Sequence, residues 1–265
     1  VAVENTALST DPNEQDMYSA EGIVANSGTG DLNIGAEDPT MGTGIGNIYS
    51  DGYGILATTD GGNMDILVDG QIVARTKDAI NAKTAGASGA NLTIGVNNKV
   101  TGGNSGIVGE NTSDTSMTTL TLGAAAEITG NAQDAVNLIN SGTDANILVQ
   151  GFIDPNDPTQ VSGVLSGSVN GAYLTAIESD ITVQNLESIS GRTGYGIYAT
   201  TNGGAVTIQN INSVTSTRSY AIKANSNGGD IKVENIALPK TTGTPTFNGG
   251  IYAQRSGGNI YLGGA

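Results

Sequence analysis

The chain has 265 residues, of which 25 are acidic and 10 are basic, and it contains neither cysteine nor histidine. The formal charge of −15 repels nucleic acid and anionic membranes, and no stretch approaches the roughly 18 to 20 apolar residues that span a bilayer, so we expect neither nucleic-acid binding nor membrane insertion. The missing residue types exclude disulfides, cysteine nucleophiles, serine–histidine triads and histidine metal sites.

The first 21 residues combine five acidic side chains with one short apolar run at residues 1–3. Arrays of stacked repeats need a modified terminal unit that hides the apolar end of the stack. We therefore expect residues 1–21 to form an N-terminal cap or a partial coil.

One spacing dominates the chain from residue 23 onward: an apolar residue is followed by a glycine seven residues later and by apolar residues at nine and eleven. Five copies keep this spacing unchanged, and they begin at Ile23, Ile55, Ile197, Ile222 and Ile251. Looser copies begin at Ile80, Ile107 and Val136 and end in the pairs Leu92/Ile94, Leu120/Leu122 and Ile147/Val149, and a shortened copy begins at Leu174. Nine units with a period of about 25 residues predict one solenoid domain over residues 1–265.

Each unit is expected to contain three short strands, because apolar residues two apart, such as Ile55 and Ala57, alternate with outward-facing ones. A third inward position follows at Ile72, Val100, Ile128, Ile189 and Val214. Parallel stacking of these strands predicts an all-β, right-handed parallel β-helix of about nine coils, because parallel crossovers are mostly right-handed and the six-residue period of left-handed β-helices is absent. One corner carries asparagines suited to a left-handed backbone or a side-chain ladder, at Asn97, Asn185, Asn210 and Asn235.

Three insertions interrupt the repeat, at residues 35–52, 151–171 and 237–248. All follow the second strand of a unit, so they are expected on one side of the rod, where solenoids carry specialised surface. The second contains Asp154, Asn156 and Asp157, whose oxygens suit calcium, although the spacing is not that of an EF-hand and two prolines favour a stiff turn. The sequence predicts no metal, no cofactor and no catalytic residue.

A column of outward positions follows the first apolar residue of each unit. It consists of Val24, Leu56, Asn81, Val108, Asn137, Thr175, Tyr198, Lys223 and Tyr252. A contiguous apolar stripe can mark a partner surface, although outward Val and Tyr are also ordinary strand formers. The predicted partner contacts are Leu56, Val108, Tyr198 and Tyr252 in this column and Asp154, Asn156 and Asp157 in the insertion. Tyr53, Tyr195 and Tyr220 occupy matching positions and are expected to stack near a corner.

The repeated pattern Y-G-I-x-A followed by G-G-x-[IV]-x-[IV], seen most clearly over residues 195–208, resembles the passenger domains of bacterial autotransporters. The similarity is to the GI-x-A repeat type of host-associated alphaproteobacteria and covers nearly the whole chain. It implies a signal peptide upstream, a translocator barrel downstream, and export through the periplasm and outer membrane to the cell surface or the medium. The GDSGS motif of protease passengers is missing, so no catalytic residue is carried over.

The resemblance implies a virulence factor, an adhesin or ligand that binds a host cell-surface protein, receptor or glycan. A β-helical polysaccharide lyase or hydrolase with paired carboxylates is the enzymatic alternative. The chain has no tryptophan and only two phenylalanines for stacking sugars, which argues against it. A stalk that lifts another module off the surface is the third hypothesis.

Overall fold

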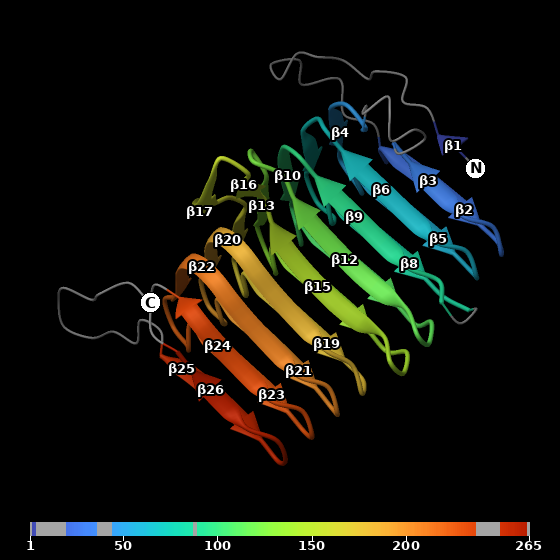
Figure 1. Cartoon of the computed structure of the whole chain (residues 1–265). Coiled ribbons are helices and arrows are strands. Elements are labelled where there is room, and N and C mark those ends of the chain that lie inside the picture. The colour runs from blue at the N-terminus through green and yellow to red at the C-terminus, as the bar shows by residue number, and fades with distance from the viewer. Residues whose placement is uncertain (1, 4–19, 36–43, 87–88, 237–249, 264–265) are drawn as a thin grey trace.

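The computed structural model describes residues 2–3, 20–35, 44–86, 89–236 and 250–263. Every regular element in these residues is a strand, and none is a helix. The strands wind into a right-handed parallel β-helix, in which each turn of the chain lies on the previous one (Figure 1). The predicted fold class is therefore confirmed.

Three stacks of parallel strands form the walls of the β-helix. The first stack is a nine-stranded sheet, so eight turns connect its first strand to its last. Its members are β2 (Ile23–Ser27), β5 (Ile55–Thr59), β8 (Ile80–Thr84), β11 (Ile107–Asn111), β14 (Val136–Asn140), β19 (Ala172–Ala176), β21 (Ile197–Thr201), β23 (Ile222–Ser226) and β25 (Ile251–Arg255).

The second and third stacks belong to one fifteen-stranded sheet, because two long strands turn the corner between them. The second stack contains β1 (Ala2–Val3), β3 (Leu32–Ile34), β6 (Met64–Val68), β9 (Leu92–Val96), β12 (Met117–Leu122), β15 (Asn146–Gly151), the first halves of β20 (Ile181–Gly191) and β22 (Val206–Ser216), β24 (Ile231–Ile236) and β26 (Ile260–Leu262). The third stack contains β4 (Ile48–Ser50), β7 (Ile72–Ala74), β10 (Lys99–Gly102), β13 (Glu127–Gly130), β18 (Val164–Gly167) and the second halves of β20 and β22.

The core is a continuous column of aliphatic side chains between these walls. Alternate strand residues point inward, so Ile197 and Ala199 of β21 are fully buried whereas Tyr198 between them is half-buried. The inward positions of successive coils pair in register, as Ile181 does with Val206. Burial stabilises the fold by about 25 cal/mol per Å² of apolar surface, and the same column continues from β2 to β25.

The turn between the first and second stacks explains the repeated glycine pair. A Cβ on Gly204 would lie 2.1 Å from the backbone of Ser179 in the preceding coil, so only glycine fits. The buried hydroxyl of Thr201 donates to the carbonyl of Ser179 at 2.7 Å and accepts from the N–H of Gly204 at 3.2 Å. Ser226 makes the same two bonds one coil later, to Gly204 and Gly229. One hydroxyl thus closes the turn and joins two coils.

The asparagine corner is confirmed for three of its four predicted members. Asn185, Asn210 and Asn235 all have positive φ, between 52° and 59°. Asn210 donates to the side-chain oxygen of Asn185 at 3.2 Å, and Asn235 donates to that of Asn210 at 2.9 Å. Asn97 is not among the positive-φ residues and instead donates to Asp69 Oδ1 at 2.6 Å.

Two predicted registers are wrong by two residues. The sixth unit begins at Ala172, which pairs with Val136 and Ile197, rather than at Leu174. In β12, the partner of Leu92 is the buried Thr118 rather than Leu120. A shift of two keeps the same face of a strand inward, so the alternation of apolar residues alone does not detect it.

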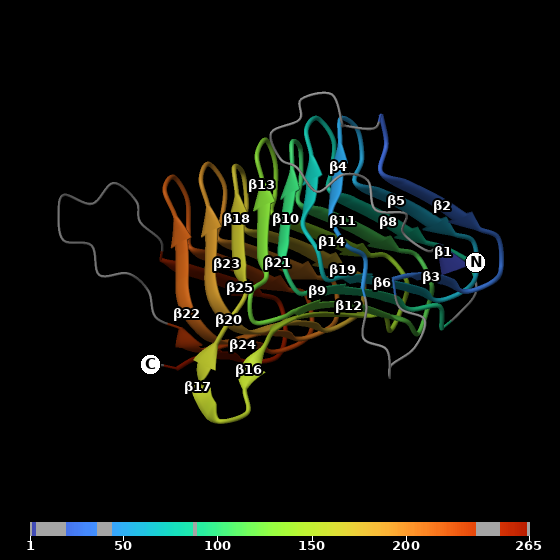
Figure 2. The same ribbon diagram turned by 90° about the horizontal axis from the view of Figure 1, so that it is seen from above.

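Within the insertion predicted at residues 151–171, β16 (Ile153–Asp154) and β17 (Asp157–Val161) form an antiparallel hairpin. The hairpin leaves the β-helix between β15 and β18 and projects from the rod (Figure 2). The predicted bounds of this insertion and of that at 35–52 are too wide, because they include β18 and β4, which are regular strands of the third stack. At the N-terminal end, β1 pairs with β3 and adds a partial coil to the second stack. The insertion at 237–248, residues 36–43 of the first insertion and residues 4–19 of the expected cap lie outside the described residues.

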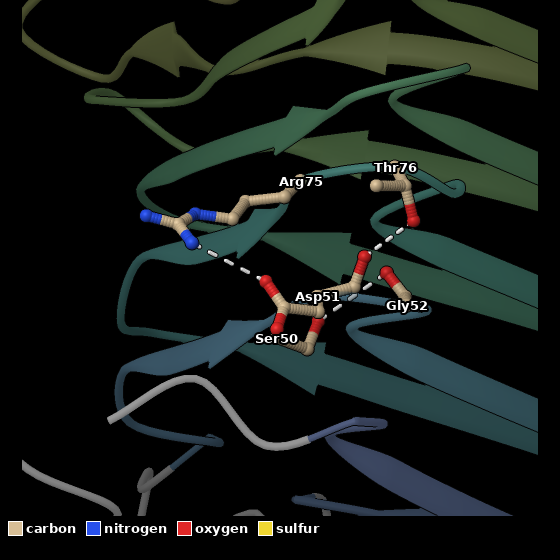
Figure 3. Close-up of polar contacts among 5 residues, drawn as sticks. All are labelled: Ser50, Asp51, Gly52, Arg75 and Thr76. Carbon is tan, nitrogen blue, oxygen red and sulfur yellow. Dashed lines mark hydrogen bonds and ion pairs between the residues drawn. The ribbon is translucent and has the colours of Figure 1, made fainter. Parts of the chain in front are cut away.

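Polar contacts tie successive coils together where the chain leaves the third stack (Figure 3). Arg75 Nη1 lies 3.4 Å from Asp51 Oδ1, and the Thr76 hydroxyl donates to the Asp51 carbonyl at 2.5 Å. Within the same turn, Ser50 donates its hydroxyl to the carbonyl of Gly52 at 3.4 Å. Both ion-pair partners are about half exposed, so the pair adds little free energy, but it neutralises a cation within the protein.

Candidate binding surface

Five of the nine tyrosines gather on the outer face of the first stack, near its C-terminal end. Together with one lysine they form a surface that we call the tyrosine strip, consisting of Tyr173, Tyr195, Tyr198, Tyr220, Lys223 and Tyr252. Four members are the second residues of β19, β21, β23 and β25, and strand alternation turns these side chains outward. Tyr195 and Tyr220 stand in the turns that lead into β21 and β23.

The rings of the strip contact one another across coils and within them. Tyr173 and Tyr198 are stacked, with centroids 4.8 Å apart and planes 4° from parallel. Tyr195 lies 5.5 Å from Tyr198, and Tyr220 lies 5.3 Å from Tyr252, each pair tilted by 39°. Of Tyr53, Tyr195 and Tyr220, the three tyrosines expected to stack near a corner, Tyr195 and Tyr220 make tilted contacts with rings of the outward column rather than stacking on each other.

Lys223 joins the two halves of the strip. Its ammonium nitrogen lies 5.3, 5.2 and 6.0 Å from the ring centroids of Tyr195, Tyr198 and Tyr252. These are cation–π distances, and each such contact is worth about 0.5–1 kcal/mol at an exposed site. The ammonium also donates to the Tyr195 hydroxyl at 3.5 Å. In the described part of the chain, no carboxylate lies within 4.0 Å of this nitrogen.

A buried carboxylate supports the strip from the coil below. Asp134 Oδ1 accepts from the backbone N–H and the side-chain amide of Asn170 at 3.0 and 2.8 Å, and Asn170 Oδ1 accepts from the Tyr195 N–H at 2.7 Å. Burial raises the pKa of Asp134, against the lowering effect of the Asn170 bonds. Desolvation, Tyr198 and Asp134 raise the pKa of Tyr173, and Lys223 lowers it less. The Tyr173 phenol therefore stays neutral at physiological pH, able to donate and accept hydrogen bonds.

The structure brings together two of the predicted contact residues. Tyr198 and Tyr252 lie two coils apart, and Lys223 stands between them in the same column. Tyr173 was missed, because the register error placed Thr175 in its position. The nine-residue spacing from Ala172 to the first apolar residue of the next strand was the signal that could have found it.

The other predicted contacts lie elsewhere. Leu56 and Val108 are half-buried in the same column, but Asn81 separates them and Asn137 separates Val108 from Tyr173. They belong to the N-terminal half of the face and do not join the strip.

The hairpin residues are also distant from the strip, because β16 and β17 leave the corner between the second and third stacks. Asp154 Oδ1 accepts from the backbone N–H of Asn156 at 2.8 Å, which closes the hairpin turn, and Asp157 accepts from Gln160 at 3.3 Å. Over the described ranges, no group of three or more Asp, Glu, His or Cys side chains is arranged to hold a metal ion. The hydrogen bonds of these two carboxylates stabilise the hairpin turn.

Comparison of the chain with family models, with curated proteins and with solved structures finds no match. Within the described residues there is also no helix long and apolar enough to cross a membrane.

Proposed function

We propose that the chain is a binding protein that attaches to a partner on a host cell surface through the tyrosine strip, acting as an adhesin or a ligand rather than as an enzyme. The observation that carries the proposal is the strip itself. Five partly exposed phenol rings, three of them within 6.0 Å of the Lys223 ammonium, form an amphipathic patch, and tyrosine is among the residues that dominate binding energy at interfaces.

The location of the protein is part of the same proposal. The resemblance of the repeats to autotransporter passengers supports export to the bacterial surface or the medium, with a translocator barrel in the full-length protein. A rigid rod suits display, because eight turns of in-register strands hold the strip in a fixed geometry.

Binding of the fluorescently labelled chain to cultured animal cells, measured by flow cytometry, tests the proposal. Tyr198→Glu and Tyr252→Glu place a charge in the strip, and we expect each to lower cell binding at least tenfold while circular dichroism remains that of a β-protein. Tyr261→Glu is the matched control, because Tyr261 is exposed on β26 of the second stack.

Two outcomes would contradict the proposal. In one, the wild-type chain does not bind any cell type in a broad panel. In the other, both strip variants bind as well as the wild type. A variant that lacks residues 154–158 distinguishes the two predicted surfaces. If this variant alone lost cell binding, the partner would contact the hairpin rather than the strip.

A further inference from the structure

An open groove of about 460 Å³ lies beside the tyrosine strip. It runs along the ends of the last strands of the first stack and the turns that follow them. Hydroxyl, amide and guanidinium groups line it, including Thr200, Asn202, Asn225, Asn227, Gln254 and Arg255. Such a lining offers hydrogen-bond donors and acceptors together with apolar surface.

The groove and the strip are one continuous surface. Thr200, Asn225 and Gln254 each follow a residue of the strip by two positions, so strand alternation turns both columns to the same face. Tyr252 donates its hydroxyl to Gln254 Oε1 at 2.7 Å, which links the columns directly. A ligand that covers the aromatic rings would also reach the polar groove.

The protein does not satisfy the polar lining by itself. Asn225 Oδ1 and Arg255 Nη1 are buried, and neither has a hydrogen-bond partner among the described residues. A buried polar group without a partner is expensive to leave in a folded protein. One acceptor and one donor of residues that line the groove thus have hydrogen-bonding capacity that the described residues do not use.

The cations of this surface also lack counterions. Arg75, Lys83 and Lys99 of the earlier coils each have a carboxylate within 4.0 Å. Lys223 and Arg255 have none within the described ranges, although acidic residues outnumber basic ones by 25 to 10. The other described cations without a carboxylate at this distance, Lys77, Arg192 and Arg218, stand in the turns that lead from the third stack to the first. Lys223 stands on the outer face of the strip and Arg255 lines the adjoining groove, so the two cations together favour a partner that brings negative charge.

We propose that the strip and the groove bind an anionic oligosaccharide. Its sugar rings lie on the phenol faces, its hydroxyl groups bond to the amides and hydroxyls of the groove, and its carboxylate or sulfate groups pair with Lys223 and Arg255. This inference rests on the proposed function and names the partner class for the same surface. The chain has no tryptophan and two phenylalanines, but it gathers five tyrosines on this surface, whose rings can stack on sugars.

Isothermal titration calorimetry with three octasaccharides tests the inference: a sulfated heparin fragment, a hyaluronan fragment that carries only carboxylates, and a neutral chitin fragment. We expect binding to one or both anionic sugars, at least tenfold tighter than to the neutral one and weakened by salt. The two anionic probes distinguish sulfate from carboxylate recognition. Lys223→Gln combined with Arg255→Gln should lower the affinity at least tenfold.

Lys83→Gln is the matched control, because Lys83 lies on the same stack and is paired with Glu110 at 3.1 Å. Equal affinity for neutral and anionic sugars, no binding to any of the three, or an equal loss in the control would overturn the inference. Binding of the chain to cells treated with heparinase, hyaluronidase and sialidase distinguishes this inference from the proposed function. Undiminished binding to treated cells, without sugar binding in solution, would leave a protein as the partner. Sugar binding without cell binding would overturn only the proposed function.

Discussion

Asn210 donates a hydrogen bond from its side-chain amide to the side-chain oxygen of Asn185, the residue directly below it in the preceding coil, at 3.2 Å. Both residues have a left-handed backbone, with φ of 54° and 59°. The asparagine therefore does two things at this corner. Its backbone bends the long strand from the second stack into the third, and its amide joins the coils.

Replacement of Asn210 separates these two roles. Asn210→Ala loses the ladder bonds and places a Cβ in a left-handed backbone, so we expect a loss of about 2 kcal/mol in the free energy of unfolding, measured by urea titration. Asn210→Gly loses only the bonds, because glycine adopts a left-handed backbone without strain. We therefore expect a loss of about 1 kcal/mol in the free energy of unfolding. Equal losses in the two variants would show that backbone strain contributes nothing.

Gly204→Ala tests the close approach of the coils. The added Cβ would lie 2.1 Å from the Ser179 backbone, which cannot move without displacing a whole coil. We expect a loss of about 3 kcal/mol or more, or failure to fold. Gly28→Ala is the control, because its Cβ meets no atom within 4 Å, and we expect it to be neutral or stabilising by less than about 1 kcal/mol. Similar stability of the two variants would contradict the steric argument.

Much of the fold could be predicted because its requirements repeat. The inward Ile, Val and Leu positions recur in every coil, and the second glycine recurs where the backbones meet, as at Gly204. The registers of Ala172 and Thr118 could not be read in this way, since a small or polar residue at an inward position breaks the apolar pattern without breaking the strand. The hydroxyl that closes the turn at Thr201 also recurs from coil to coil, but a search for apolar residues alone does not find it.

A double-mutant cycle on Tyr173 and Tyr198 measures the stacking of the strip. Their rings are 4.8 Å apart and almost parallel, so Tyr173→Ala and Tyr198→Ala remove the same contact. We expect the double variant to be less destabilised than the sum of the single variants, with a coupling energy of about 0.5–1.5 kcal/mol by urea titration. Additive losses would show that the two rings do not stabilise each other.

Asp134→Asn tests the buried carboxylate. Burial raises the pKa of Asp134 in the folded state above its ordinary value of 3.8, so its contribution to stability is full below that value and is lost as the pH rises through the folded pKa. Asparagine keeps one oxygen for the two Asn170 donors and carries no charge. We therefore expect the variant to gain stability relative to the wild type between about pH 4 and pH 7. A constant difference in urea titrations across that range would contradict this.

The candidate surface was less accessible to sequence reasoning than the fold. Tyr198 and Tyr252 could be predicted because strand alternation alone places them outward. Tyr173 depended on the correct register, and the groove at Asn225 and Arg255 depends on which side-chain atoms find partners within the protein. That is a property of neighbouring coils rather than of any spacing along the chain.

The cations of the first stack differ in their ion pairing between its two ends. Lys83 of an early coil is neutralised by Glu110, whereas among the described residues no carboxylate lies within 4.0 Å of Lys223 or Arg255 near the other end. We expect the proposed anionic partner to approach the C-terminal coils of this face, where Lys223 lies, rather than the coil of the neutralised Lys83. Because salt screens such forces within about 10 Å at 0.1 M, orientation before contact would appear as an association rate that falls with ionic strength while dissociation changes less.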